Sequence, residues 1–179
     1  MLTIVVPARE YFDEQKNEFI SDKEHTLQLE HSLLSLSKWE AKWNKPFLST
    51  NEKTEEEILD YVRCMTVTQN VDPSIYYKLS KDNVEKINEY INLPMTATTF
   101  NDRGGAKNRE VITAEIIYYW MISFNIPFEC QKWHLNKLLT LVKVCSIKNT
   151  PPKKMSKREI MNRNHALNAS RRKALGSRG

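Results

Sequence analysis

Cys130 and His134 are the two residues whose types and spacing come nearest to a chemical site. They are four positions apart, so on a helix they would share one face, and zinc ligands are sometimes spaced in this way. A structural zinc site needs about four ligands, however, and no second pair of cysteines or histidines has a similar spacing. The sequence therefore predicts that Cys130 is a small buried apolar residue and His134 a hydrogen-bonded residue at the edge of the core. It predicts no metal site and no cofactor.

Three other patterns are weaker candidates for catalysis. A cysteine nucleophile at Cys130 would need an acid that orients His134, and Glu129 would point elsewhere on a helix. Residues 101–110 (NDRGGAKNRE) are glycine-rich and basic, but they lack the Gly-Lys-Ser/Thr ending of a phosphate-binding loop. The three glutamates at positions 55–57 suit the start of a helix better than a pair of catalytic acids. We therefore expect a protein that is not an enzyme.

The elements that would position these residues are mostly helices. Residues 2–6 (LTIVV) are β-branched and parts of 18–30 alternate, with a turn at 13–17 between them, which predicts a small β-hairpin. From residue 31 onward apolar residues recur every three or four positions, as in amphipathic helices. The predicted helices cover residues 31–43, 49–65, 71–80, 80–94, 109–125, 126–149 and 157–175. The expected fold class is mainly α: a helical domain with a small N-terminal β-hairpin and a detached basic C-terminal helix.

Some of the predicted helices have recognisable starts and faces. Thr54 with Glu57, and Ser156 with Glu159, form capping-box patterns. Residues 109–125 are apolar nearly all round, which predicts an enclosed central helix. The apolar stripe expected after Thr54 consists of Ile58, Tyr61, Val62 and Met65. The apolar residues expected on the helix within 126–149 are Trp133, Leu135, Leu138, Leu139, Leu141, Val142 and Cys145.

Charge divides the chain into two parts. Residues 1–147 carry 17 basic and 21 acidic side chains, whereas residues 148–179 carry 10 basic and 1 acidic. The net charge of +5 is therefore the sum of a mildly acidic body and a strongly basic tail. The Pro-Pro pair at 151–152 separates them, so we expect a core domain at 1–149 and a tail helix at 150–179. An odd number of cysteines, no signal-peptide pattern and no apolar run of about 18 residues predict a soluble cytoplasmic protein.

The tail and the tryptophans are the candidate surfaces for a partner. Clustered Lys and Arg suit phosphate groups, an acidic protein surface or an anionic membrane. The tail has no aromatic side chain on which a base could stack, and its few apolar residues make a membrane the least expected partner. A solvated tail without a function is a further alternative. The candidate partner-binding residues are Trp39, Trp43, Trp133, Lys153, Lys154, Lys157, Arg158, Arg163, Arg171, Arg172 and Lys173. Trp39 and Trp43 would serve this role if they are partly exposed.

Several stretches resemble small proteins encoded among the tail genes of tailed bacteriophages, near the tape-measure gene. These stretches are QLEHSLLSLSKWEAKWNKPFL (28–48), MTATTF (95–100), IPFECQKWHLNKLLTLVKVCSIKN (126–149) and the ending from residue 151. Proteins encoded at that place are often tail assembly chaperones. Such chaperones are not enzymes: they bind the long, apolar tape-measure protein, keep it soluble and help tail-tube subunits to polymerise around it.

The resemblance implies a role in tail morphogenesis in the host cytoplasm, with tape-measure and tail-tube proteins as partners. It leaves open a structural role in the virion, as a head–tail connector or tail-completion protein. It carries over no catalytic or ligand motif. Independently of the resemblance, the basic tail leaves open weak nucleic-acid binding as the function.

Overall fold

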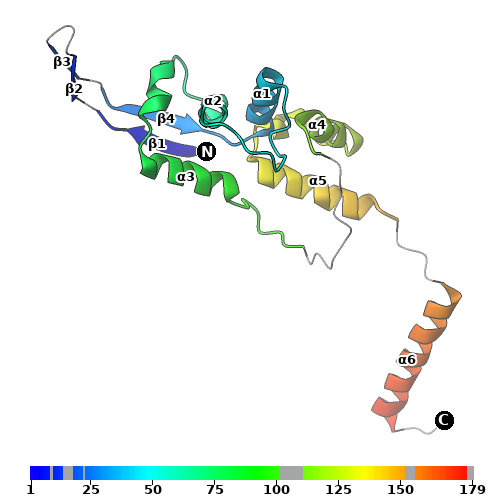
Figure 1. Ribbon diagram of the computed structural model, residues 1–179. Coiled ribbons are helices and arrows are strands. Elements are labelled where there is room, and N and C mark those ends of the chain that lie inside the picture. Colours follow the sequence, from blue (N-terminus) through cyan, green and yellow to red (C-terminus); the bar gives the residue numbers. More distant parts are fainter. Residues whose placement is uncertain (9, 14–17, 22, 101–110, 152–155, 177–179) are drawn as a thin grey trace. The chain divides into compact units, whose positions relative to one another are not determined.

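The computed structural model describes residues 1–8, 10–13, 18–21, 23–100, 111–151 and 156–176. The chain divides into two compact units, Met1–Ser146 and Ile147–Gly179. Helices predominate and a short antiparallel β part stands at the N-terminus, which confirms the predicted fold class (Figure 1). Within the described residues, no helix is long and apolar enough to cross a membrane.

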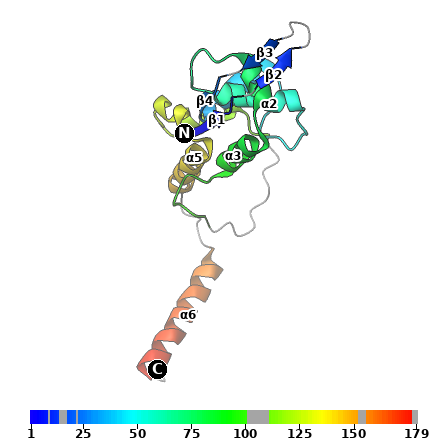
Figure 2. The same cartoon turned by 90° about the vertical axis from the view of Figure 1, so that its left-hand side faces the viewer.

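The N-terminal β part consists of two antiparallel strand pairs. β1 (Leu2–Val6) pairs with β4 (His25–Leu29), and β2 (Glu10–Asp13) pairs with β3 (Glu18–Ser21). Figures 1 and 2 show β1 and β4 side by side. The predicted hairpin is thus confirmed, although its second half contains two strands and β2 was not expected. The predicted turn at 13–17 falls outside the described residues, except for Asp13, which ends β2.

The pair β1–β4 has one buried face and one covered edge. Ile4 and Val6 on β1 are buried and their neighbours along the strand are not, as expected for a strand with one face on the core. On the other side of β4, the backbone N–H of Glu30 donates to Met65 and that of Val67 donates to Gln28, both at 2.8 Å. Just after the end of the second helix, Thr66 therefore forms an isolated antiparallel bridge with Leu29 of β4.

Seven helices were predicted and the described residues form eight in the same order, because the range 126–149 holds two. They are α1 (Leu33–Trp43), α2 (Glu55–Met65), the 3₁₀ helix η1 (Pro73–Lys78), α3 (Lys81–Asn92), α4 (Ala114–Ser123), the 3₁₀ helix η2 (Phe128–Lys132), α5 (Leu135–Asn149) and α6 (Lys157–Leu175). The capping boxes at Thr54 and Ser156 are both present. The helix predicted over 126–149 is instead a 3₁₀ turn followed by α5, so Trp133 precedes the helix on which it was expected.

Two apolar clusters form the core of the first unit, and α1 contributes to both. One cluster joins β1 and β4 to α2, η1 and α3, and it includes Trp39 of α1. The other joins α4 and α5, and it includes Leu33 and Leu36 of α1. Phe47, in the segment after α1, packs against both clusters. The helix α1 is therefore the element that the two halves of the core share.

Two predictions about helix faces are wrong. Ile58 was expected in the apolar stripe of α2, but it is 47% exposed, and Glu57 is buried instead. The helix α4 was expected to be enclosed, but Tyr119 and Ile122 are more than half exposed and only one face packs against the core. The helix was also predicted to start at residue 109, but Thr113, whose backbone is in the β conformation, is its N-cap. Residues 111 and 112 therefore precede the helix.

Glu40 of α1 is a buried carboxylate that joins three segments. One carboxylate oxygen accepts the backbone N–H of Phe47 at 2.8 Å, and the other accepts that of Ala114 at 2.7 Å. Ala114 is the first residue of α4, where Thr113 provides no side-chain cap. Glu40 therefore supplies the missing cap from another helix, at the end where the helix dipole favours a negative charge.

Replacing Glu40 with Gln should destabilise the protein by about 1–3 kcal/mol, because an amide offers one oxygen and cannot accept both N–H groups. The measurement is urea unfolding followed by circular dichroism. Glu115→Gln, on the exposed face of α4, is the matched control and should change the free energy of unfolding by less than about 0.5 kcal/mol. Equal unfolding midpoints for the two variants would contradict the bridging role of Glu40.

Candidate functional site

The structure places Cys130 and His134 in different local structures. Cys130 lies in η2, whereas His134 lies between η2 and α5, where its backbone forms an isolated antiparallel bridge with Ser32. The two residues therefore do not share a helical face, and the expected burial of Cys130 is confirmed; His134 is buried as well. Among the described residues, no group of three or more His, Cys, Asp or Glu is arranged to hold a metal ion.

His134 instead contacts a second buried histidine, His31, which the sequence reading did not single out. The two rings meet edge to face, with 5.1 Å between their centroids. The hydroxyl of Tyr61 lies 2.6 Å from Nδ1 of His31, and Nε2 of His134 lies 3.0 Å from the backbone oxygen of Tyr90. The contact brings together the segments before α1 and α5, far apart in the sequence, so no local spacing could have predicted it.

Both histidines are held in the neutral form near pH 7. Burial, and next the nearby His134, lowers the pKa of His31 to about 4. Burial also lowers the pKa of His134, partly offset by its hydrogen bond to the Tyr90 backbone and by the charge of Glu30. With Nδ1 unprotonated, neutral His31 accepts the hydroxyl proton of Tyr61. The histidine pair is therefore part of the packing of the core.

The three tryptophans predicted to contact a partner differ in exposure. Trp39 is 1% exposed, and its indole N–H donates to the backbone oxygen of Glu57 at 2.8 Å, so the expected exposure is wrong for this residue. Trp43 is half-buried, and its indole N–H donates to Asp60 at 2.9 Å. Trp133 is 39% exposed, beneath the Lys137 ammonium, which lies 4.3 Å from its ring centroid. Trp43 and Trp133 keep surface that a partner could contact.

The main concave feature of the first unit runs along α1 and α2, and we call it the α1–α2 groove. It consists of three adjoining hollows of about 460, 370 and 110 Å³. The first and second hollows share Lys38 and Cys64 in their walls, and the second and third share Lys42, Asp60 and Arg63. The shared residues show that the three hollows follow one another along α1 and α2.

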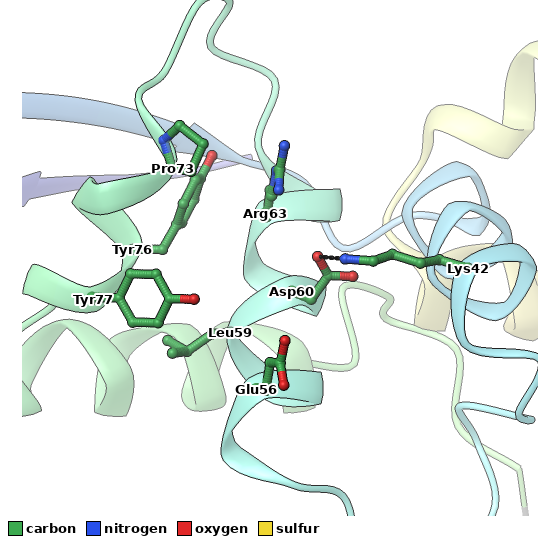
Figure 3. Close-up of a pocket in the computed structure, with 8 residues that line it drawn as sticks. All are labelled: Lys42, Glu56, Leu59, Asp60, Arg63, Pro73, Tyr76 and Tyr77. Atoms are coloured by element: carbon green, nitrogen blue, oxygen red, sulfur yellow. Dashed lines mark hydrogen bonds and ion pairs between the residues drawn. The ribbon is translucent and has the colours of Figure 1, made fainter.

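The two ends of the groove differ in chemistry. The largest hollow has an apolar wall to which Leu34 of α1, Met65 at the end of α2 and Val67 after α2 contribute. The smallest hollow lies between α2 and η1, where Figure 3 shows the Tyr77 side chain beside Leu59 and the Tyr76 ring beside Pro73. The residues drawn there are Lys42, Glu56, Leu59, Asp60, Arg63, Pro73, Tyr76 and Tyr77. Tyr77 is the most exposed of them among the apolar and aromatic ones, at 72%.

The groove is lined by four basic side chains and by three carboxylates, Glu30, Glu56 and Asp60, of which Glu30 is paired with the N-terminal ammonium group. Lys42 is paired with Asp60, as the dashed line in Figure 3 shows. Lys38, Arg63 and Lys132 are exposed, and within the described part of the chain none of them makes an ion pair. Three free cations therefore line a groove in a unit whose sequence is acidic overall. The sequence reading missed this site; the signal that points to it is the spacing of four at Leu34, Lys38 and Lys42, which places all three on one face of α1.

Cys64 lies on the floor between the first two hollows. Its thiol is half-buried, and burial, with a further effect of the Asp60 charge, raises its pKa. The charges of Lys38, Lys42 and Arg63 act in the opposite direction. A raised pKa keeps the thiol protonated and slow to react at neutral pH. We therefore treat Cys64 as a lining residue of the groove.

The second unit offers a different surface, the helix α6. It begins with a capping box at Ser156 and ends at the left-handed residue Gly176, and none of its residues is buried. Its ribbon is labelled in Figure 2. The predicted partner-binding cations on it are Lys157, Arg158, Arg163, Arg171, Arg172 and Lys173. Lys153 and Lys154 lie outside the described residues. The helix also exposes the apolar side chains of Ile160, Met161, Leu167 and Leu175.

Comparisons with known proteins identify no relative of this chain. The chain matches no protein-family model, and no curated protein or solved structure is significantly similar to it. The candidate sites therefore rest on the residues and geometry of this chain alone.

The buried histidine pair makes the stability of the protein sensitive to acid. The pKa of His31 is lower in the folded protein than in the unfolded chain, so the unfolded chain binds the proton first as the pH falls. The stabilisation is complete above about pH 6.5 and should be lost between about pH 6.5 and 4, with about 3 kcal/mol from His31. His134 acts in the same direction. The measurement is urea unfolding at a series of pH values.

Two variants isolate this effect. His31→Gln should be less stable at pH 7 but should lose less stability between pH 6.5 and 4.5 than the parent protein. His25→Gln replaces an exposed histidine and should leave the pH profile unchanged. The lowered pKa values of Glu57 and Asp72, caused by the Lys45 hydrogen bond and the Ser74 backbone N–H respectively, affect stability only at lower pH. An unchanged pH profile for His31→Gln would contradict the assignment.

Proposed function

We propose that this protein is a tail assembly chaperone of a tailed bacteriophage, which binds tape-measure and tail-tube proteins during tail morphogenesis. The resemblance of residues 28–48 and 126–149 supports the phage assignment. In this proposal the protein acts by binding and not by catalysis, without a cofactor, in the host cytoplasm. The alternative within the same setting is a structural role in the virion, at the head–tail connector or in tail completion.

The observation that carries the binding role is the composition of α6. The helix has 19 residues, so it is about 28 Å long, and none of them is buried. Ile160, Leu167 and Leu175 are seven and eight positions apart, which places them along one side of the helix. A capped helix with an apolar row among basic residues suits a partner groove that combines apolar and acidic surface.

The direct test is co-expression with a phage tape-measure protein. The expected result is a higher soluble fraction of the tape-measure protein when the chain is present. Arg171→Glu with Lys173→Glu should reduce this gain, because it replaces two docking cations of α6 by anions. The readout is the soluble fraction on a gel, together with co-purification of the two proteins.

The matched control places the same charge change on the first unit. Lys81→Glu with Lys86→Glu alters two exposed lysines of α3 and should leave the soluble fraction at the parental level. Circular dichroism should show that both double variants are folded. If the chain does not raise the solubility of the tape-measure protein, the chaperone role is contradicted. If the two double variants behave alike, the docking role of α6 is contradicted.

A second candidate function is nucleic-acid binding, and the charge of the second unit favours it. Residues 147–179 carry 10 basic side chains and 1 acidic side chain. If about six cations of α6 contact phosphates, the affinity for a DNA duplex should fall roughly a thousandfold between 50 and 200 mM salt. Fluorescence anisotropy with a labelled duplex measures this slope. Affinity that does not depend on salt, or no binding at 50 mM salt, would exclude phosphate contacts as the function of α6.

A further inference from the structure

We infer that the α1–α2 groove is a second protein-binding site, which takes an acidic, extended segment of a partner chain with one apolar anchor residue. The inference does not depend on the phage role or on α6, because it follows from the shape, the charge and the apolar wall of the groove. Each of these three properties narrows the class of ligand.

The length of the groove favours a linear ligand. Its wall on α2 runs from Glu56 to Met65, and the helix rise of 1.5 Å per residue makes this roughly 14 Å. An extended peptide covers that distance with about four or five residues. A single compact anion such as inorganic phosphate would fill only one of the three adjoining hollows.

The charge of the groove favours an acidic ligand. Lys38 and Arg63 stand on opposite walls of the middle hollow, and Lys132 stands at the rim of the largest one. None of the three is neutralised by a carboxylate of the described chain, so each can pair with a carboxylate of a ligand. The free cations lie on a unit that is otherwise acidic, so their local field differs in sign from that of the surrounding surface.

The apolar wall fixes the position of the anchor. The apolar wall of the largest hollow is formed mainly by Leu34 and Val67, and Val67 is 53% exposed. A leucine-sized side chain would cover this wall and exclude water from it. At the opposite end Glu56 would repel an acidic residue. The acidic residues of the ligand should therefore lie between the anchor and Arg63.

The test uses the full-length protein and a readout inside the groove. The probe is a peptide in which one leucine is flanked on each side by three glutamates, so that either chain direction can be accommodated. Iodoacetamide alkylates Cys64 slowly, and peptide mapping by mass spectrometry follows this residue alone. Binding of the probe to α6 therefore does not contribute to the signal. At a peptide concentration of about ten times Kd, occupancy should slow alkylation about tenfold.

Two double variants are compared through the ratio of alkylation rates without and with the peptide. The ratio is needed because Lys38 and Arg63 also affect the reactivity of Cys64 itself. Lys38→Glu with Arg63→Glu should bring the ratio to about one at the same peptide concentration, because two attractive pairs become repulsive. Lys81→Glu with Lys86→Glu is the control and should keep the parental ratio. Lys38→Gln with Arg63→Gln should weaken protection and serves if the first variant does not fold.

The peptide itself separates the remaining outcomes. Replacing its leucine with glycine should weaken protection, because the apolar wall is then left uncovered. Equal protection by the glycine peptide, or by inorganic phosphate at the same concentration, would overturn the proposal in favour of a simple anion site. Absence of protection by the leucine peptide, or equal loss of protection in the two Glu double variants, would overturn it altogether. A failed co-expression test with the tape-measure protein would leave this result untouched.

Discussion

The carboxylate of Glu40 sets a constraint on which the first unit depends, because a buried charge must have hydrogen-bond partners. Its two oxygens take the backbone N–H groups of Phe47 and Ala114, and so fix the segment after α1 and the start of α4 against α1. Phe47 in turn stacks on Tyr61, with ring centroids 3.7 Å apart, and so joins the segment to α2. The Glu40 side chain thus links the two apolar clusters, because it accepts hydrogen bonds from backbone N–H groups in two different segments. Few other side chains carry two acceptor oxygens that could do this.

The position of α1 between the clusters also determines the groove. Since Leu33, Leu36 and Trp39 face inward, the helical period places Leu34, Lys38 and Lys42 on the remaining side. That side cannot rotate without exposing core residues. The cations of the groove are therefore held on rigid elements, and a ligand that binds them has little backbone ordering to oppose it.

The features that could be predicted from the sequence are those set by near neighbours. The capping boxes of α2 and α6 and the Pro at the start of η1 are local signals, and each element begins where they indicate. Long-range contacts decided the rest. Glu57 is buried because its carboxylate pairs with Lys45 and caps its own helix, and this leaves Ile58 outside. The same segment accepts the indole N–H of Trp39, which removes that tryptophan from the surface.

The candidate sites show the same division between local and long-range information. The helix α6 was predictable because its caps and its charge lie within one stretch of sequence, whereas the groove needs α1, α2 and η1 to meet. The net charge of +5 indicates neither site, because it sums the charges of the basic tail and of the acidic first unit, which includes the groove. The candidate groove is therefore identified by charged side chains that lack a partner in the folded protein. Whether a charge has a partner is decided only when the helices pack together.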